Sequence, residues 1–282
     1  MIKTLRKPDW IRYKIPGGKD YLRVKKTVDE LGLHTICTEA GCPNFGECFA
    51  RGTATFLILG DTCTRNCAYC AVNKGVPSPP EMDEPERIAE AVRILDLKYA
   101  VITSVTRDDL KDGGASIFAE TCRQISEKNK ECRIELLIPD FRNSTGQSIE
   151  IILKEEIHIL NHNIETVKEL FPRVRAGGDY GHSLKLLKNA VDMGAKVKSG
   201  LMIGLGETGE QITSTMQDLL DAGCRLLTVG QYLQPGQKQH EVVKYYHPDE
   251  FEQIKDSGLR MGFDRIFAGP NVRSSYLADS LY

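Results

Sequence analysis

Short apolar runs alternate with longer amphipathic stretches along the chain from residue 54 onward. Runs of this length, rich in Val, Ile and Leu, are typical of buried strands. They lie at 54–59, 99–103, 134–138, 157–160, 197–203 and 225–229, with a seventh run at 264–268. The stretches between them repeat apolar residues at helical spacing, which predicts helices at 84–97, 115–129, 146–155, 163–170, 183–193, 209–222 and 248–261.

The helix at 84–97 carries the clearest signals. Asp83 can cap its start, and Pro85 lies in its first turn. Its apolar stripe consists of Ile88, Val92 and Leu95. Because strands alternate with helices, the chain is expected to form a parallel sheet with right-handed crossovers. Periodicity leaves two architectures open, a doubly wound sheet and a curved, barrel-like sheet.

The N-terminal segment differs from the rest of the chain. Residues 1–20 contain prolines and paired glycines without apolar periodicity, which predicts an extended arm over the main body. A short helix follows at 21–33 and ends near Gly32. No linker, low-complexity tract or fixed repeat interrupts the chain, so arm, core and tail are expected to form one unit.

Charge and hydropathy exclude several classes of partner. Lys plus Arg number 37 and Asp plus Glu 39, so no overall field favours nucleic acid or an anionic membrane. No apolar run approaches the roughly 18 residues of a membrane span, and the first residues lack the apolar region of a secretory signal. We therefore expect a soluble, cytoplasmic protein. We also expect it to be a monomer.

Cysteine usage points to chemistry. The chain has nine cysteines, many for a compartment in which thiols stay reduced. Six of them lie between Cys37 and Cys70. The other three are expected to be ordinary core or surface residues: Cys122, Cys132 and Cys224.

The strongest motif directly follows the first strand. Cys63, Cys67 and Cys70 form a C-x3-C-x2-C run. Three soft thiolates can hold three corners of a cubane iron-sulfur cluster and leave the fourth iron open. The alternative is a zinc knuckle, although no fourth Cys or His follows at short spacing.

A second triplet precedes that strand. Cys37, Cys42 and Cys48 form a C-x4-C-x5-C run, again without a nearby fourth Cys or His. This spacing predicts a second cluster with one distant ligand. The alternative is a shared zinc site for all six cysteines.

With Tyr69 before its last cysteine, the C-x3-C-x2-C run resembles the signature of radical S-adenosylmethionine enzymes. The resemblance implies that the open iron chelates the amino and carboxylate groups of S-adenosylmethionine. One electron then cleaves the sulfonium to give methionine and a 5'-deoxyadenosyl radical. Such a radical can take hydrogen from an unactivated alkyl carbon, which no side-chain base could deprotonate.

Together, the sequences CTEAGCPNFGEC, FLILGDTCTRNC and the tail RSSY resemble the lipoyl synthase family from about residue 8 to the C-terminus. The resemblance implies that Ser275 closes the second, auxiliary cluster. It also implies that two S-adenosylmethionine molecules are consumed in turn. Auxiliary-cluster sulfides would then be inserted at carbons 6 and 8 of a protein-bound octanoyl-lysine. Gly41 stands where many relatives carry a basic residue, which leaves open how this loop meets the substrate.

The same resemblance implies contacts to S-adenosylmethionine. Ser104 and Asp108 would accept from its ammonium group, although this loop could instead only cap the helix at 115–129. The ribose would meet Asn and Glu side chains, the carboxylate an Arg, and the adenine a glycine-rich turn. These roles fall on Tyr69, Asn161, Asn163, Glu165, Arg175, Gly204, Gly206 and Glu207. The neighbouring His162 is expected to be structural.

The expected fold is an incomplete (β/α)6 TIM-like barrel with an N-terminal arm and a C-terminal tail carrying the auxiliary cluster. Its segments are a cysteine-bearing extension (1–53), the core (54–262) and the tail (263–282). Implied partners are an octanoylated lipoyl carrier, such as the glycine-cleavage H protein or a 2-oxoacid dehydrogenase acyltransferase subunit, and flavodoxin or ferredoxin as electron donor. Remaining alternatives are another sulfur-inserting radical enzyme such as biotin synthase, an iron-sulfur carrier and a zinc-binding module.

Overall fold

The computed structural model describes residues 5–12, 17–51, 54–276 and 278, and they form two compact units. The unit that we call N-terminal comprises Tyr13–Arg65, Val72–Asn161 and Leu277–Tyr282. The unit that we call C-terminal comprises Met1–Arg12, Asn66–Ala71 and His162–Tyr276. The boundary between the units therefore falls within the C-x3-C-x2-C run, and each unit is described separately.

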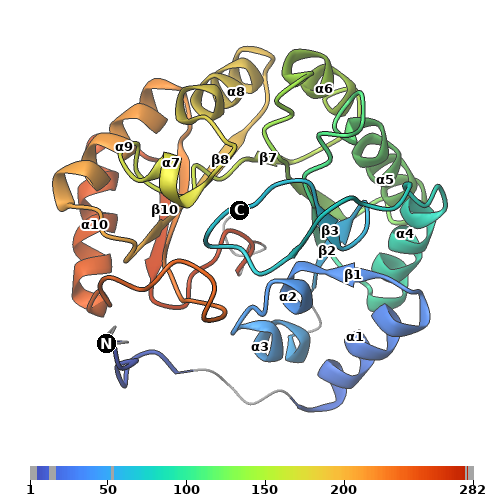
Figure 1. Ribbon diagram of the computed structural model, residues 1–282. Coiled ribbons are helices and arrows are strands. Elements are labelled where there is room, and N and C mark those ends of the chain that lie inside the picture. Colours follow the sequence, from blue (N-terminus) through green and yellow to red (C-terminus); the bar gives the residue numbers. More distant parts are fainter. Residues whose placement is uncertain (1–4, 13–16, 52–53, 277, 279–282) are drawn as a thin grey trace. The chain divides into compact units, whose positions relative to one another are not determined.

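The N-terminal unit contains five neighbouring strands in the order β1-β2-β5-β6-β7. Its strands are β1 (His34–Thr35), β2 (Thr55–Ile58), β5 (Tyr99–Ser104), β6 (Arg133–Leu137) and β7 (Ile159–Asn161). All neighbours are parallel except β1, which pairs antiparallel with β2. Its longer helices, which follow one another around the strands in Figure 1, are α1 (Lys19–Glu30), α4 (Glu84–Leu95), α5 (Ala115–Lys128) and α6 (Thr145–Ile152).

The C-terminal unit contains three parallel strands in the order β8-β9-β10. They are β8 (Val197–Ile203), β9 (Leu226–Gln231) and β10 (Arg265–Gly269). Its helices are α7 (Phe171–Val174), α8 (Tyr180–Asp192), α9 (Gly209–Asp221) and α10 (Pro248–Met261). The predicted alternation of parallel strands with helices is thus confirmed in both units.

Helix starts follow from local hydrogen bonds. Thr208 and Gln211 form a reciprocal capping box at the start of α9. The prediction for the start of α4 is wrong in one respect. Asp83 occupies the N-cap position but makes no cap hydrogen bond, because its carboxylate pairs with Arg87 one turn later, at 3.2 Å.

The predicted helix at 163–170 is wrong. Glu165 instead bridges to Leu201 of β8, donating its N–H to Gly200 O at 3.0 Å. The backbone of Glu165 has a φ of +71°, which a right-handed helix cannot contain. Helical geometry begins only at Phe171.

Besides β1 and α7, four short elements were not predicted, because each is too short to show periodicity. They are α2 (Ile36–Glu39), α3 (Phe45–Ala50), β3 (Thr62–Cys63) and β4 (Asn73–Lys74). All four lie around the cysteine triplets, so this part of the chain is more ordered than its sequence pattern suggests.

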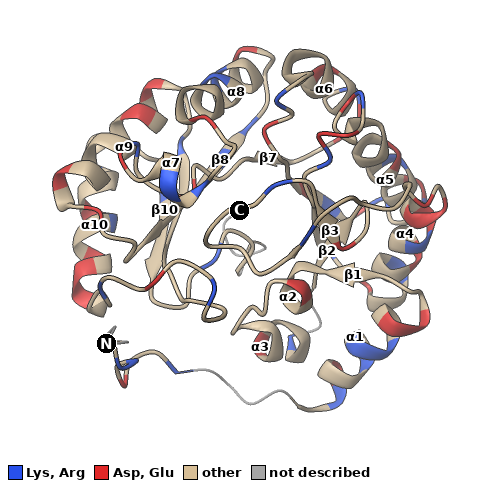
Figure 2. Ribbon diagram, in the orientation of Figure 1, with Lys and Arg blue, Asp and Glu red and all other residues tan. Residues whose placement is uncertain are grey.

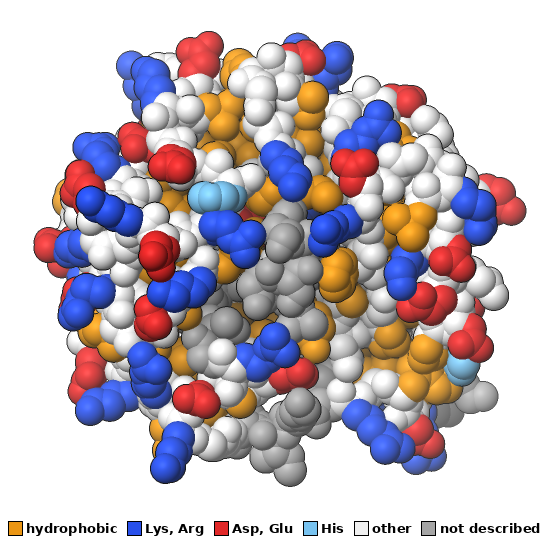
Figure 3. Space-filling model, turned by 180° about the vertical axis from the view of Figure 1, so that it is seen from behind, with side chains coloured by type: hydrophobic (Ala, Val, Ile, Leu, Met, Phe, Trp, Pro, Cys, Tyr) orange, Lys and Arg blue, Asp and Glu red, His pale blue; other side chains and the backbone are white. Residues whose placement is uncertain are grey.

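Charged residues of both signs lie along the helices, whereas the sheets are largely buried (Figure 2). On the face seen in Figure 3, Lys and Arg side chains are interspersed with Asp and Glu, in keeping with a formal charge of -2. No helix among the described residues is long and apolar enough to cross a membrane. The three cysteines expected to be structural are all buried: Cys122, Cys132 and Cys224.

The packing of α10 gives a stability prediction. An added Cβ at Gly258 would lie 2.1 Å from Ile266 and 2.4 Å from Met216. We expect Gly258→Ala to destabilise the protein by about 1–3 kcal/mol, as overpacked cores do. The measurement is the shift of the urea unfolding midpoint. Gly209→Ala, at a position with no atom within 4 Å of the added Cβ, is the control, and equal stability of the two variants would contradict the packing.

Candidate functional site

The triplet Cys37, Cys42 and Cys48 lies in and between two short helices of the N-terminal unit. Thr35 caps α2, its side chain accepting from Thr38 N at 3.3 Å. Cys37 lies in this helix and its carbonyl accepts from Cys42 N at 3.0 Å. Cys48 lies in α3, where its N–H donates to Asn44 O at 2.9 Å. These backbone bonds fix the turns in which the three cysteines lie.

Burial and mutual repulsion act on these thiols. Burial raises the pKa of both Cys37 and Cys48 to about 12, and the charge of Cys42 adds to the effect at both sites. A raised pKa of this kind disfavours the thiolate in the absence of a cation. A metal centre reverses that balance, because ligation releases the thiol proton. The donor set therefore suits an iron-sulfur cluster.

This arrangement predicts the pH dependence of alkylation in the iron-free, reduced protein. With a pKa of about 12 against 9.0 for an unperturbed thiol, Cys37 and Cys48 should react about a thousandfold more slowly than a small thiol at pH 8. Their rates should rise about tenfold per pH unit up to pH 10, because the thiolate is the nucleophile. Iodoacetamide labelling with peptide mass spectrometry measures this, and rates independent of pH would contradict the burial.

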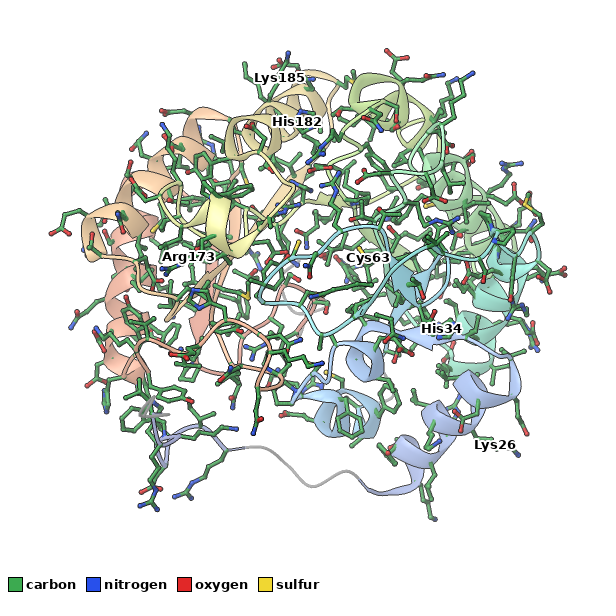
Figure 4. All side chains as sticks on the ribbon, in the orientation of Figure 1. Lys26, His34, Cys63, Arg173, His182 and Lys185 are labelled. Carbon is green, nitrogen blue, oxygen red and sulfur yellow. The ribbon has the colours of Figure 1, made fainter. Side chains whose placement is uncertain are left out.

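The triplet of the C-x3-C-x2-C run begins in the N-terminal unit with Cys63. It lies in β3, pairs in register with Lys74 of β4, and accepts from Gly75 N at its carbonyl, at 3.1 Å. Arg65 N donates to Cys63 Sγ at 3.4 Å. In Figure 4, Cys63 lies on the inner side of its unit, whereas Lys26 of α1 points outward. The strand and loop bonds fix the position of the thiol.

Cys67 and Cys70 belong to the C-terminal unit and lie in a turn in which Cys70 N donates to Cys67 O at 3.2 Å. Between them, Ala68 donates to Val174 O at 2.8 Å and accepts from His240 N at 2.8 Å. Tyr69 packs in an apolar cluster with Val174, Leu205 and Tyr232. The turn is therefore held by backbone bonds on both sides.

Predicted cofactor residues meet in the C-terminal unit. Asn163 Nδ2 donates to Glu165 Oε1 at 3.2 Å, and Arg175 donates to Asn163 O at 2.7 Å. Burial raises the pKa of Glu165, although Arg175, Asn163 and Tyr69 oppose this. Asn163 Oδ1 is buried and has no hydrogen-bond partner among the described residues. An unsatisfied buried acceptor is costly, so this group fits a ligand donor such as a ribose hydroxyl.

Glu207 shapes the glycine-rich turn after β8. Its carboxylate accepts from Gly204 N at 2.6 Å and from Leu205 N at 2.9 Å. Gly204 has a φ of +103°, and an added Cβ would lie 2.1 Å from Gln231 Nε2. Gly204 therefore lets Gln231 approach the turn, and Glu207 holds the turn closed.

The remaining predicted cofactor residues lie in the N-terminal unit. Ser104 ends β5, and its buried Oγ has no partner among the residues that the structure describes. Both carboxylate oxygens of Asp108 accept from Arg65, at 2.7 Å each. Asn161 is fully buried at the end of β7, where its Nδ2 donates to Glu135 at 2.7 Å. Ser104 Oγ and Asn161 Oδ1, both buried and without a partner among the described residues, can thus accept from a ligand, whereas both carboxylate oxygens of Asp108 already bond Arg65.

Ser275, the predicted auxiliary ligand, is half-buried in a turn of the C-terminal unit. In this turn Tyr276 N donates to Arg273 O at 3.0 Å. The neighbouring Ser274 accepts from Asn163 at 3.3 Å. An added Cβ at Gly230 would lie 2.1 Å from Val272 O, so this glycine lets the segment that leads to Ser275 approach β9. His162, in the same unit, is fully buried. Its Nε2 lies 3.1 Å from Ser183 Oγ, as expected of a structural histidine.

Sequence reasoning missed several buried polar residues. Arg65 and Asp140 form an ion pair at 2.5 Å, and Tyr99 donates to Glu135 at 2.7 Å. The position of Asp140 in the loop after β6 was the available signal, because loops at strand carboxyl ends carry function. Among the described residues, no three His, Cys, Asp or Glu side chains converge as ligands of a single metal ion.

Comparison with known proteins decides the family. The "Radical SAM superfamily" matches residues 57–219, and the "N-terminal domain of lipoyl synthase of Radical_SAM family" matches residues 2–42. Lipoyl synthase of Geobacillus kaustophilus (strain HTA426) is 51% identical over 278 residues, covering 98% of this chain and 93% of that protein. The chain belongs to the lipoyl synthase family.

A second relative agrees. Lipoyl synthase of Caldicellulosiruptor saccharolyticus (strain ATCC 43494 / DSM 8903 / Tp8T 6331) is 48% identical over 281 residues, covering 99% of this chain and 98% of that protein. As a lipoyl synthase family member, the chain is a radical S-adenosylmethionine enzyme that uses two 4Fe–4S clusters and acts on an octanoylated carrier protein. Biotin synthase, an iron-sulfur carrier and a zinc module are thereby set aside.

Solved structures confirm the fold class. The structure titled "Crystal structure of HydG: A maturase of the [FeFe]-hydrogenase" aligns with a TM-score of 0.58 at 14% identity, over 86% of this chain and 61% of that chain. The structure titled "Crystal structure of methylornithine synthase (PylB)" aligns with a TM-score of 0.52 at 15% identity, over 66% and 54%. These likenesses show the fold alone, the α/β partial barrel expected for the family.

Proposed function

We propose that the two cysteine triplets divide the work of this lipoyl synthase family member. Cys63, Cys67 and Cys70 hold the cluster with the open iron. Only a few residues separate these cysteines, so the chain itself keeps them within reach of one cluster. One-electron chemistry at unactivated C–H bonds is what this cluster and S-adenosylmethionine supply when bound.

In the same proposal, Cys37, Cys42 and Cys48 hold the auxiliary cluster, which is a substrate because its sulfide ends in the product. Ser275 is the fourth ligand. Each insertion replaces one C–H bond of the octanoyl chain, at carbons 6 and 8, with one C–S bond. A serine oxygen suits a cluster that must be dismantled, because iron-sulfur clusters are otherwise held by softer thiolates.

The chain's own polar groups bind and orient S-adenosylmethionine. Two buried acceptors are proposed to take hydrogen bonds from the cofactor: Ser104 Oγ from its ammonium group and Asn163 Oδ1 from a ribose hydroxyl. Arg175 is proposed to hold the methionine carboxylate, and Glu165 the ribose. Supporting contacts to the same molecule are assigned to Tyr69, Asp108, Asn161, Gly204, Gly206 and Glu207.

Carrier, electron donor and location complete the proposal. The carrier is the glycine-cleavage H protein or a 2-oxoacid dehydrogenase acyltransferase subunit, and the donor is flavodoxin or ferredoxin. The proposed location is the cytoplasm, because a chain with nine cysteines, six of them in two cluster-binding triplets, suits a compartment in which thiols stay reduced. The extension (1–53), core (54–262) and tail (263–282) are proposed as the segments that carry the auxiliary triplet, the radical site and Ser275.

The observation that supports the assignment is the presence of two cysteine triplets without disulfides. One is held by the turns of α2 and α3, and the other by β3 and the turn that contains Cys67 and Cys70. The test is anaerobic incubation of reconstituted protein with S-adenosylmethionine, dithionite and an octanoyl-lysine peptide. We expect the peptide to gain two sulfur atoms as a dithiol in the reducing mixture, and to lose two hydrogen atoms only when this dithiol is later oxidised in air to the cyclic disulfide. A peptide of unchanged mass, alongside full 5'-deoxyadenosine formation, would contradict the assignment of the auxiliary triplet.

A further inference from the structure

The loop that carries Cys63 is bonded to the loop after β5 in the N-terminal unit. Thr64 N and Oγ1 both donate to Thr106 O, at 3.0 and 2.9 Å. In return, Asp108 N donates to Thr64 Oγ1 at 3.2 Å. The two loops are therefore joined next to Cys63 by backbone as well as side-chain bonds.

Arg65 extends this connection to a third loop. Its Nε and Nη2 bind Asp108 at 2.7 Å each, and its Nη1 and Nη2 bind Asp140 at 2.5 and 2.6 Å. Both pairs are bidentate, a geometry that fixes orientation as well as distance. One guanidinium thus locks the chain after Cys63 to loops that follow β5 and β6.

Burial makes this cluster of charges unusual. Arg65 is 9% exposed and Asp140 1% exposed. Burial alone would lower the pKa of Arg65, but the hydrogen bonds and charges of Asp108 and Asp140 raise it. Buried ion pairs contribute little to stability compared with apolar packing, and their best-supported use is to specify one geometry. Two carboxylates around one cation fit that use.

The constrained geometry reaches the thiol directly. Arg65 N donates to Cys63 Sγ at 3.4 Å, so the residue that makes the ion pairs also orients a hydrogen bond to the sulfur. Hydrogen bonds to ligating sulfurs are among the factors that set cluster potentials. Groups that orient a first ligand typically affect metal affinity or activity about 10–100-fold.

We propose that Arg65, held by Asp140 and Asp108, is the positioning residue that fixes Cys63 as a ligand of the radical cluster. This inference rests on the proposed assignment of Cys63 to that cluster. It gives Arg65 and Asp140, which the sequence patterns did not single out, a defined part in the reaction.

The test uses iron-free, reduced protein and the alkylation rate of Cys63, compared among Arg65→Gln, Arg65→Lys and Asp140→Asn. We expect the rate to rise about tenfold in all three, because the thiol is no longer held. If Arg65 acted on Cys63 only through its positive charge, Arg65→Gln would slow the alkylation of Cys63, and Arg65→Lys would leave the rate unchanged. An unchanged or slower rate in Arg65→Gln overturns the proposal.

Cys122, buried in α5 of the same unit, reports on folding in the same experiment. It should stay protected in every variant. If Cys122 and Cys63 became reactive together in all three variants, Arg65 would merely hold the fold, and the proposal would fail.

Iron content distinguishes failure of the positioning role of Arg65 from failure of the assignment of Cys63 to the radical cluster. If Cys63→Ala keeps its full iron content, the ligand assignment itself fails. If Cys63→Ala loses one cluster while Arg65→Gln leaves Cys63 reactivity unchanged, only the positioning role fails.

Discussion

Replacing Cys67 with alanine is expected to abolish 5'-deoxyadenosine formation. Loss of one of three thiolates leaves too few ligands to hold a cubane with one iron open. Because changes in groups that merely orient a ligand cost about 10–100-fold, loss of the ligand itself should exceed about a hundredfold. The measurement is 5'-deoxyadenosine by chromatography and mass spectrometry after anaerobic incubation with S-adenosylmethionine and dithionite.

Cys132→Ala is the matched control for this experiment. Cys132 is buried, but it lies outside both triplets. The control should retain its 5'-deoxyadenosine formation and its iron content. If Cys67→Ala retained the activity as well, the assignment of the C-x3-C-x2-C run to the radical cluster would be wrong.

Replacing Cys42 with alanine should separate the two activities in the opposite way. The auxiliary cluster is lost, so sulfur insertion into an octanoyl-lysine peptide should fall below detection. The radical site holds its own ligands, so 5'-deoxyadenosine should still form at a rate within about a few-fold of the parent protein. Both products are measured in the same reaction mixture.

The position of Cys42 makes a folding artefact easy to recognise. Cys42 lies in the turn between α2 and α3, and Cys37 O accepts its N–H, a backbone bond that alanine keeps. Far-ultraviolet circular dichroism should therefore not change. Equal loss of both activities in a variant with an unchanged spectrum would argue against two separate roles.

The sequence predicted the regular elements of the fold because the runs and stripes that form them are long enough to show a period. Strands β2, β5, β6, β7, β8, β9 and β10 lie within a few residues of the expected apolar runs. The helix prediction for 163–170 failed because the backbone of Glu165 has a φ of +71° and forms a β-bridge with Leu201 of β8. Tertiary pairing overrode helical periodicity at that point.

The candidate site was predictable only where residue chemistry is self-evident. Cysteine spacing marked both triplets, whereas Arg65 resembles any charged loop residue until the fold brings Asp108 and Asp140 to it. The short helices α2 and α3 could not be predicted either, because helices of four and six residues are too short to show an apolar periodicity. Long-range pairing of single polar residues leaves no local pattern.

Metal and sulfide analysis of the anaerobically purified and reconstituted protein tests the central claim most directly. Two thiolate-held cubanes predict about eight iron atoms and about eight acid-labile sulfides per chain. Cys67→Ala and Cys42→Ala should each lower both counts to about four. Two results would contradict the claim of two independent clusters: zinc without sulfide in the parent protein, or loss of all the iron in both Cys67→Ala and Cys42→Ala.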